Sequence, residues 1–411
     1  MNILLGAYAC EPNNGSEPEV GWQMANEIAR AMPEDKIYVI TKSNNKPVIE
    51  KEHYPANLKF YYYGIPQWLS FWKKGGRGIR TYYYFWMIGA ARFMKAQNIK
   101  FDIIHHITFV NDWLPSFFLL LKNKQNKFIW GPIGSNDPIS NIFLDGRKRI
   151  RVEKIKIISR YLFRLINPSF HFCKRRSDCI IGINANVRKK LALGQNQHFI
   201  DESAIGVSKS VIEQLSFSSR PSNKFLVISV GRLVYIKNFK LTVLVFAKFL
   251  KNNPSSNACL QIIGEGHDRE LLEKLVKALG IVRQVEFIGK VSLSKVQEYL
   301  SNASVFLFPT LENAGFVTLE AMSHKLPVLA MDYGGPQQFV QSFKKEQLVS
   351  AYEPYDQITE TLANNLEKFY LDRKLRKEIG ERNHKDVLEN FTWEAKAQRM
   401  KKLYKELVNE T

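Results

Sequence analysis

Continuous apolar runs alternate with helically spaced apolar residues along the chain, most regularly between residues 305 and 336. There the pattern predicts a buried strand at 305–308, a helix at 316–323 and a second buried strand at 327–330. Pro309 ends the first strand, and Gly-Gly-Pro at 334–336 predicts a turn after the second. Such a strand–loop–helix–strand unit belongs to a parallel sheet, whose ligands bind where strands end and helices begin.

The same alternation extends over the chain and predicts an α/β protein. Apolar runs predict further strands at 2–7, 36–41, 58–63, 101–108, 127–130, 179–183, 225–230, 259–264 and 285–289. Helical spacing predicts further helices at 20–32, 239–250, 269–279, 293–301 and 394–408. Because 411 residues are too many for one core, we expect two doubly wound domains facing each other across a cleft. We place them at 1–206 and 207–393, with a linker rich in Ser and Asn at 208–224.

Composition narrows the class of protein. With 45% hydrophobic and 24% charged residues, the chain is globular rather than disordered. Its four cysteines show no metal-binding spacing, which favours reduced thiols in a cytoplasmic protein. The first apolar run is too short for a signal peptide, and no stretch approaches the roughly 18 uncharged apolar residues of a membrane span. We therefore expect a soluble or peripheral protein.

The charge is large and uneven. The net charge is +20, and residues 147–190 alone hold 14 basic and 2 acidic side chains. A basic run is often only a solvated face, but this excess is larger than solubility requires. It predicts contact with an anionic partner, and we favour anionic lipid.

A second basic segment, residues 65–95, is also rich in aromatic side chains. The aromatic residues are Trp68, Phe71, Trp72, Tyr82, Tyr83, Tyr84, Phe85 and Trp86, interleaved with Lys73, Lys74, Arg77, Arg80 and Arg92. Residues 82–93 fit an ordinary core helix. The mixture also fits a bilayer interface and, less well, the stacking of single-stranded nucleic acid.

Two stretches of the second half predict an anion site. Gly315 at a helix start leaves free N–H groups at the positive end of the helix dipole. Arg232 and Lys237 follow another predicted strand and precede a helix, an arrangement that binds anions. Glu312 and Glu320 fit such a site if the ligand also offers hydroxyl groups, as a nucleotide sugar does.

These stretches resemble a known family. Glu312 and Glu320, separated by seven residues and flanked by Pro309, Gly315 and Ala321, resemble the glutamate motif of retaining glycosyltransferases of family 4. That family has the GT-B fold of two facing Rossmann-like domains. The stretch 231–238 resembles its pyrophosphate clamp, and 391–408 resembles a last helix that returns to complete the first domain, which we place at 394–411.

The resemblance implies a set of donor-site residues. It implies catalytic roles for Arg232, Lys237 and Glu312, and for His105 or His106, which end a predicted strand in an Asp-x-x-His pattern. The implied donor-binding residues are Gly15, Gly231, Arg232, Lys237, Gly264, Gly266, Glu312, Asn313, Ala314, Gly315, Phe316, Val317 and Glu320. Gly15 would lie under the donor phosphates, while Glu320 would hold ribose and Glu312 the hexose.

Acceptor contacts are expected in the first domain. Glu17 lies in the loop after the first strand, and Asn111, Asp112 and Trp113 follow the strand that holds the histidines. Gly134 lies in a loop resembling one found in polysaccharide-building members of the family.

The resemblance implies transfer of a hexose from a UDP- or GDP-hexose with retention at the anomeric carbon, by a front-face mechanism. No metal motif is evident, so we expect no metal and no cofactor beyond the nucleotide-sugar co-substrate. A basic, aromatic first domain fits a lipid-linked glycan acceptor at an anionic membrane. We therefore expect bacterial O-antigen, capsule or exopolysaccharide biosynthesis, with the protein cytoplasmic and peripheral on the inner face of the plasma membrane, and no nucleic-acid partner.

Other functions remain open from the sequence. A retaining synthase or phosphorylase on soluble sugars would share the fold and the clamp, and a nucleotide-sugar epimerase would need no acceptor. A basic membrane- or nucleic-acid-binding protein would explain the charge but not two glutamates beside an anion site.

Overall fold

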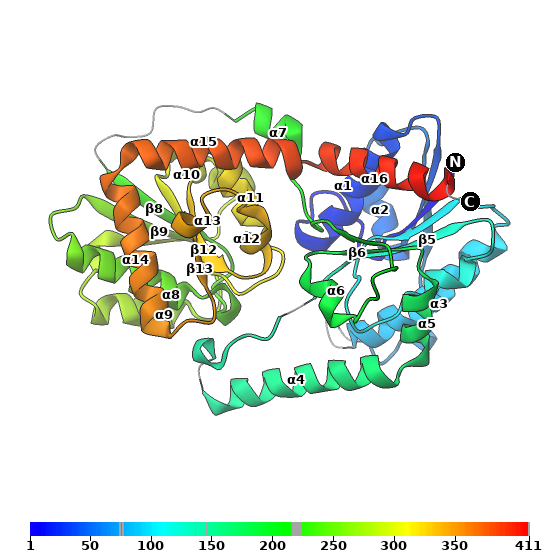
Figure 1. The fold of residues 1–411 in the computed structure, drawn as a ribbon, viewed down its shortest axis with the longest axis horizontal. Helices are drawn as coiled ribbons and strands as arrows, with labels where there is room; N and C mark the ends of the chain where they lie inside the picture. The colour runs from blue at the N-terminus through cyan, green and yellow to red at the C-terminus, as the bar shows by residue number, and fades with distance from the viewer. Residues whose placement is uncertain (74, 76–77, 136, 145, 216–223, 410–411) are drawn as a thin grey trace. The chain divides into compact units, whose positions relative to one another are not determined.

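The computed structural model describes residues 1–409 apart from 74, 76–77, 136, 145 and 216–223, and it divides into two units (Figure 1). The first unit consists of Met1–Ser135, Lys156–Gly206 and Trp393–Thr411. The second consists of Asn136–Ile155 and Val207–Thr392. Each unit is built on one sheet of parallel strands covered by helices.

The first sheet has seven strands among the described residues, in the order β3-β2-β1-β4-β5-β6-β7. They are β1 (Asn2–Gly6), β2 (Lys36–Lys42), β3 (Leu58–Tyr63), β4 (Ile103–His106), β5 (Lys127–Ile133), β6 (Cys179–Gly182) and β7 (Phe199–Asp201). Every pair is parallel. Chain order reverses direction between β1 and β4, where Gly6 pairs with His106, and this is the switch point at which ligands of such sheets bind.

The second sheet has six described strands in the order β10-β9-β8-β11-β12-β13, again all parallel. They are β8 (Phe225–Val230), β9 (Ala258–Ile263), β10 (Val285–Gly289), β11 (Val305–Leu307), β12 (Val328–Asp332) and β13 (Leu348–Ser350). The switch point lies between β8 and β11. The fold is therefore the predicted one, with two Rossmann-like doubly wound sheets.

The α-helices cover both sheets. Those of the first unit are α1 (Ser16–Ala31), α2 (Lys46–Ile49), α3 (Ile79–Ala96), α5 (Pro168–Arg176), α6 (Asn186–Lys190) and α16 (Trp393–Asn409). Those of the second unit are α7 (Lys209–Glu213), α8 (Phe239–Asn252), α9 (Arg269–Ala278), α10 (Leu293–Asn302), α11 (Phe316–Ser323), α12 (Gly334–Phe339), α13 (Lys344–Gln347), α14 (Tyr355–Leu371) and α15 (Arg373–Asn390). The helix α4 (Arg147–Ile166) contributes residues to both units.

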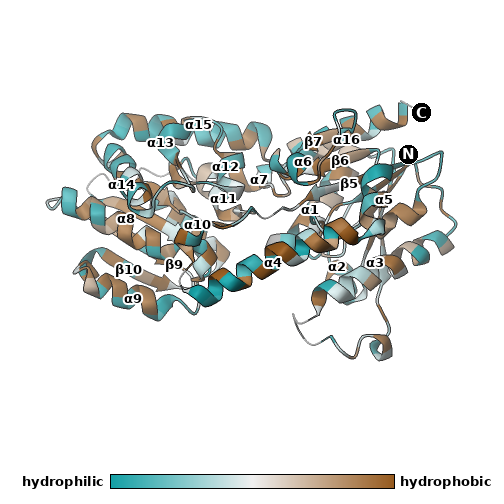
Figure 2. Cartoon of the chain, turned by 60° about the horizontal axis from the view of Figure 1, so that its bottom comes forward, coloured by the Kyte–Doolittle hydropathy of each residue, from teal (hydrophilic) through white to brown (hydrophobic). Residues whose placement is uncertain are grey.

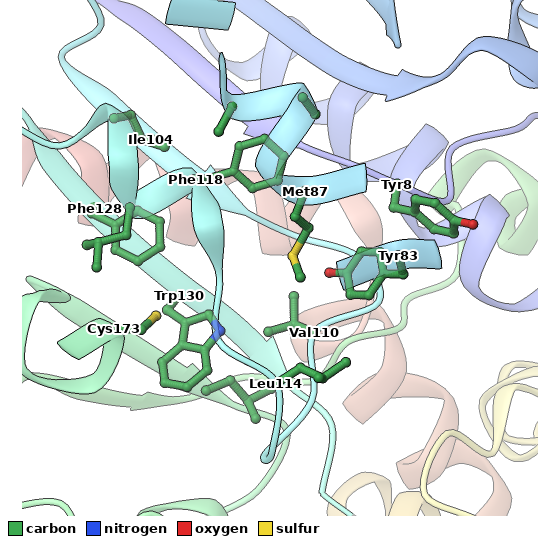
Figure 3. Close-up of a cluster of buried hydrophobic side chains, with 14 of the residues drawn as sticks. Tyr8, Tyr83, Met87, Ile104, Val110, Leu114, Phe118, Phe128, Trp130 and Cys173 are labelled. Atoms are coloured by element: carbon green, nitrogen blue, oxygen red, sulfur yellow. The ribbon is translucent and has the colours of Figure 1, made fainter. Parts of the chain in front are cut away.

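The aromatic segment 65–95 divides into a core helix and an exposed loop. In α3 the buried residues are Tyr83, Trp86, Met87, Ala90, Ala91 and Met94, at the three- and four-residue spacing of one helix face. Figure 3 shows Tyr83 and Met87 in this core with Trp130 of β5. The core-helix interpretation is therefore confirmed for this part of the segment. In the preceding loop, by contrast, Trp68 and Phe71 are largely exposed.

Several short elements differ from the prediction. The chain at 334–336 begins the helix α12 rather than forming a turn, because Pro336 lies in the first helical turn, where its missing N–H needs no partner. The strands β7 and β13, each of three residues, were not predicted. The helix α1 begins at Ser16, four residues earlier than predicted.

Residues 137–155 pack with the second unit, although the sequence placed them in the first domain. The Tyr333 hydroxyl donates a hydrogen bond to the Asp137 carbonyl at 2.5 Å, and the rings of Phe143 and Tyr355 are 5.9 Å apart. The helix α16, at the other end of the chain, belongs to the first unit: Arg399 donates two hydrogen bonds, of 2.6 and 2.9 Å, to the carboxylate of Glu202.

All four cysteines are buried, and none forms a disulfide. Among the described residues, no helix combines the length and apolar character needed to cross a bilayer.

Candidate functional site

The candidate site of the second unit lies at the switch point, where the loops after β8, β9, β11 and β12 meet. Backbone hydrogen bonds join the first two loops: Gly231 N–H donates to Ile263 O at 2.9 Å, and Leu233 N–H donates to Glu265 O at 3.0 Å. A Cβ on Gly264 would lie 1.9 Å from Gly231 O, and one on Gly266 would lie 2.2 Å from Leu233 O. Glycine at 264 and 266 is therefore needed for these two loops to touch.

Lys237 and Glu312 form an ion pair in this site. Their side chains are only 13% and 19% exposed, and the Lys237 ammonium also lies 5.3 Å from the centre of the Phe308 ring. The loops that carry them are joined by Leu311 N–H, which donates to Ile236 O at 2.8 Å. The charge of Lys237 is thus balanced by Glu312, and the contact between the two loops fixes its position.

The helix α11 begins beside this pair. Gly315 is its N-cap residue, with φ at 68°, and no side chain caps the helix end. Among the residues that the structure describes, no acceptor is bonded to the N–H groups of Phe316 or Val317. The Thr318 hydroxyl is buried without a partner in the same turn. An open, uncapped helix start of this kind attracts an anion.

Two charged side chains of these elements form no ion pair with a described residue. Arg232 is exposed, and no described residue bonds its guanidinium group. Glu320, one turn into α11, forms no ion pair with a described residue, and burial raises the pKa of its carboxyl group. Arg232 is free to bind an anion, and Glu320 is free to accept hydrogen bonds.

The loop 312–315, which also holds Asn313 and Ala314, packs closely on the start of α12. A Cβ on Gly334 would lie 2.1 Å from Glu312 O, and one on Gly335 would lie 2.3 Å from Ala314 O. Gly335 N–H donates to Glu312 O at 3.3 Å. This contact sets the position of Gly315 and of the helix start behind it.

Both predicted histidines of the first unit are buried. His105 Nδ1 is 2.7 Å from the Tyr404 hydroxyl and its Nε2 is 2.7 Å from Gly131 O, while His106 Nε2 is 2.7 Å from the Tyr83 hydroxyl. Burial lowers the pKa of His105 to about 4 and that of His106 to about 3, so both are neutral at neutral pH. Their contact with a donor sugar stays a prediction, since both imidazoles have structural partners here.

Gly15 and Glu17 lie at the start of α1. Gly15 is its exposed N-cap residue, and a Cβ at this position would meet nothing within 4 Å. The Glu17 carboxylate accepts a hydrogen bond from Phe109 N–H at 2.6 Å, and burial raises the pKa of its carboxyl group. The Arg80 guanidinium lies 4.8 Å from the centre of the Phe109 ring. The sequence does not predict Arg80 as a site residue, because Arg80 is far from Glu17 along the chain and only the fold brings the two together.

The predicted acceptor residues gather at the ends of β4 and β5. Asp112 N–H donates to Gly134 O at 3.2 Å, and the Asn111 side chain accepts from Trp113 N–H at 3.3 Å. The Asp112 carboxylate accepts from the Ser135 hydroxyl at 2.9 Å.

Two cations join this acceptor group, and sequence reasoning missed both. Lys190 donates to the Ser135 hydroxyl at 2.8 Å, and Arg164 lies 3.5 Å from the Asp112 carboxylate. Both belong to the basic stretch 147–190. The charge of that stretch predicts an anionic partner, but it does not indicate which of its residues join the site.

Residues 211–386 match the family model described as "Glycosyl transferases group 1". The matched range lies within the second unit and covers less than half of the chain. The clamp residues and the glutamate motif all lie inside the matched range.

One curated relative is named as a glycosyltransferase. The chain is 25% identical over 224 residues to the lipopolysaccharide core biosynthesis glycosyltransferase LpsE of Rhizobium meliloti, covering 54% of this chain and 62% of LpsE. The chain spans about half the length of the first curated relatives that it matches.

Two solved structures extend the likeness to nearly the whole chain. Sucrose-phosphate synthase from Thermosynechococcus elongatus has a TM-score of 0.69 at 18% identity and covers 100% of both chains. Anabaena HepE in complex with UDP and glucose has a TM-score of 0.58 at 15% identity and covers 98% of both chains. At these identities the likeness establishes the fold, which is that of GT-B glycosyltransferases.

Proposed function

We propose that this protein is a retaining glycosyltransferase of family 4 that moves a hexose from a UDP- or GDP-hexose to a lipid-linked glycan. The observation that carries the proposal is the open N-terminus of α11 with an unpaired Arg232 and a fixed Lys237–Glu312 pair at the switch point of a group 1 domain. Together they offer donors for a diphosphate and carboxylates for sugar hydroxyls.

The donor would be held by groups of different charge. The N–H groups of Phe316 and Val317 and the guanidinium of Arg232 would bind the diphosphate. Glu320 would accept from the ribose hydroxyls, and Glu312, fixed by Lys237, from the hexose hydroxyls. The complex of HepE with UDP and glucose makes a UDP-hexose the first donor to test.

The transfer would proceed on one face of the sugar. The bond between the anomeric carbon and the β-phosphate oxygen breaks while the acceptor oxygen bonds to the same face, and the acceptor proton passes to the departing phosphate. Charge grows on that phosphate in the transition state, where Arg232, Lys237 and the α11 amides would stabilise it. These protein charges would take the place of a divalent metal.

The proposed acceptor and cellular location are based on the charge of residues 147–190 and on the names of the curated relatives. The excess of basic residues in 147–190 favours an anionic membrane that presents the acceptor, and the name of LpsE supports surface polysaccharide synthesis. We accordingly place the protein on the inner face of a bacterial plasma membrane, in O-antigen, capsule or exopolysaccharide synthesis.

The first test is nucleotide binding by calorimetry and thermal shift, with UDP, GDP and their hexoses. Arg232→Ala should weaken binding of the preferred nucleotide by roughly tenfold to a hundredfold, because a hydrogen bond to a charged group contributes about 1.5–3 kcal/mol. Arg283→Ala, which removes an exposed arginine of the short 3-10 turn before β10, is the matched control and should bind as the wild type does. If no nucleotide binds, or if both variants bind alike, the clamp assignment fails.

A product analysis separates the alternatives. Transfer to a glycan on a diphospholipid supports the proposal. Transfer only to a soluble sugar would identify a synthase, and conversion of the donor without acceptor would identify an epimerase.

A further inference from the structure

The helix α4 leaves most of its large apolar side chains exposed to solvent, unlike an ordinary helix on the surface of a soluble protein. None of its residues, all of which the structure describes, is buried. A helix on the surface of a soluble protein ordinarily turns its apolar side to the core and its charged side to water. Figure 2 shows strongly hydrophilic and strongly hydrophobic residues side by side along this helix.

The side of α4 that contacts the rest of the protein holds several charged residues together with Phe163, whose ring lies 5.6 Å from that of Trp113. In the second unit, the Tyr235 hydroxyl donates to the Glu153 carboxylate at 3.1 Å, and the Arg149 guanidinium lies 5.2 Å from the centre of the Tyr235 ring. In the first unit, Arg164 lies 3.5 Å from the carboxylate of Asp112. At 3.6 residues per turn, positions 149, 153 and 164 share one side of the helix.

The opposite side of α4 is an exposed apolar stripe. It consists of Ile155, Ile158, Leu162, Leu165 and Ile166, each between 48% and 73% exposed. Steps of three and four residues place all five side chains in one row. Single exposed apolar residues are normal, but a continuous row of five large ones marks a surface that meets a partner.

The charges next to the stripe indicate what that partner is. Arg147, Lys148, Arg151 and Lys154 lie on the same side of α4, in the turns that precede the stripe. The one acidic residue of the helix, Glu153, lies on the other side with Tyr235. The exposed side is therefore apolar and cationic without a carboxylate, which fits the headgroups and acyl chains of an anionic bilayer. A second copy of the chain would bring like charges together.

We propose that α4 docks this protein on anionic lipid, with residues 155–166 at the boundary of the acyl chains and the four cations among the headgroups. Docking by α4 deepens the proposed function, because it assigns this helix to the membrane partner. It rests on the proposed function only for the reason why the protein would dock. Docking is measured without nucleotide, acceptor or turnover, so the two proposals can fail separately.

The test is flotation of the full-length protein with vesicles of phosphatidylcholine, alone or with added phosphatidylglycerol. The wild type should float with the anionic vesicles and less so at high salt, because exposed charges are screened. Ile158→Ser/Leu162→Ser/Leu165→Ser should lose at least about tenfold in vesicle affinity, since three apolar side chains no longer leave water. Arg151→Gln/Lys154→Gln should lose affinity for anionic vesicles and much of its salt dependence.

Leu271→Ser/Leu293→Ser is the matched control, because it makes the same exchange at two exposed leucines of the second unit and should float as the wild type does. A wild type that stays unbound would overturn the docking proposal, as would a stripe variant that floats undiminished. A wild-type dimer in sedimentation that the stripe variant abolishes would also overturn it and assign the stripe to a second copy. UDP binding by the stripe variant should equal that of the wild type. A wild type that floats with the anionic vesicles but binds no UDP would instead count against the proposed function.

Discussion

At the scale of single residues, the two glutamates of the motif have opposite electrostatic surroundings. Glu312 is compensated by Lys237, so its carboxylate is held in place at little electrostatic cost. Glu320 has no such partner among the described residues, and burial raises the pKa of its carboxyl group. An unpaired, partly buried carboxylate destabilises a fold, so its presence favours a role in binding over a role in stability.

This difference gives a prediction for Glu320→Gln. A raised pKa means that the folded protein favours the protonated carboxyl group, so the wild type loses stability as the pH rises above the ordinary value of 4.5. Glutamine carries no charge and avoids that loss. The variant should therefore be more stable than the wild type at neutral pH, with a gain that shrinks toward pH 4.5, as measured by urea unfolding across the pH range.

The same variant should bind the nucleotide more weakly, by roughly tenfold, because a neutral amide is a weaker acceptor for two ribose hydroxyls than a carboxylate. Glu378→Gln, at an exposed position of α15, is the control and should change neither quantity. A Glu320→Gln protein that is less stable at neutral pH would contradict the assignment of an unpaired charge.

The residue types of the site could be predicted from the sequence, but their partners could not. Arg232 and Lys237 stand out because they follow an apolar run and precede a helix. That Lys237 is paired with Glu312 depends on how two loops separated by many residues pack, which no local pattern contains. The hydrogen-bond partners of His105 and His106, which are Tyr404 and Tyr83, were hidden for the same reason.

At the scale of elements, segments with an apolar pattern of their own could be predicted, and segments without one could not. The bounds of β3, β8 and α11 agree with the prediction, because each has an unbroken apolar pattern of its own. The strands β7 and β13 and the helix α12 have no such pattern, so their stability comes from neighbours rather than from their own sequence. By itself, the sequence Gly-Gly-Pro predicts a turn. In this fold, the same three residues begin the helix α12.

The contact between α12 and the loop 312–315 gives the next prediction. Gly335→Ala would ordinarily stabilise a helix by about 0.5–1 kcal/mol. Here the new Cβ would lie 2.3 Å from the Ala314 carbonyl oxygen, so the loop must move, at a cost of about 1–3 kcal/mol. The clash should outweigh the helix gain, and a displaced Gly315 should weaken nucleotide binding. Urea unfolding and calorimetry measure the two effects.

Gly194→Ala is the matched control for this substitution. Nothing lies within 4 Å of its Cβ position, and its backbone lies outside the left-handed region, so neither stability nor nucleotide affinity should fall. Equal nucleotide affinity for Gly335→Ala and the wild type would show that the loop position is not set by α12.

At the scale of the whole molecule, the chain order does not follow the division into units. Residues 137–155 pack with the second unit, although the segments before and after them in the sequence belong to the first. The helix α16 packs with the first unit, although it directly follows the second in the sequence. Likeness to a known family indicated the return of the last helix. The crossing of 137–155 could not be predicted, because it rests on single contacts such as that between Tyr333 and Asp137.

The return of α16 gives the last prediction. Tyr404 is fully buried and bonded to His105, so Tyr404→Ala should destabilise the first unit by about 3–5 kcal/mol through the cavity that it leaves. Tyr404→Phe keeps the ring and should cost only about 1 kcal/mol, for the lost hydrogen bond. The residues assigned to the nucleotide all belong to the second unit except Gly15, so UDP affinity should stay within about twofold in both variants. Urea unfolding and calorimetry test this together. If Tyr404→Ala kept its helix content yet lost UDP affinity tenfold or more, the first unit would have to supply much of the nucleotide site, and the assignment of donor binding to α11 and its neighbouring loops would be wrong.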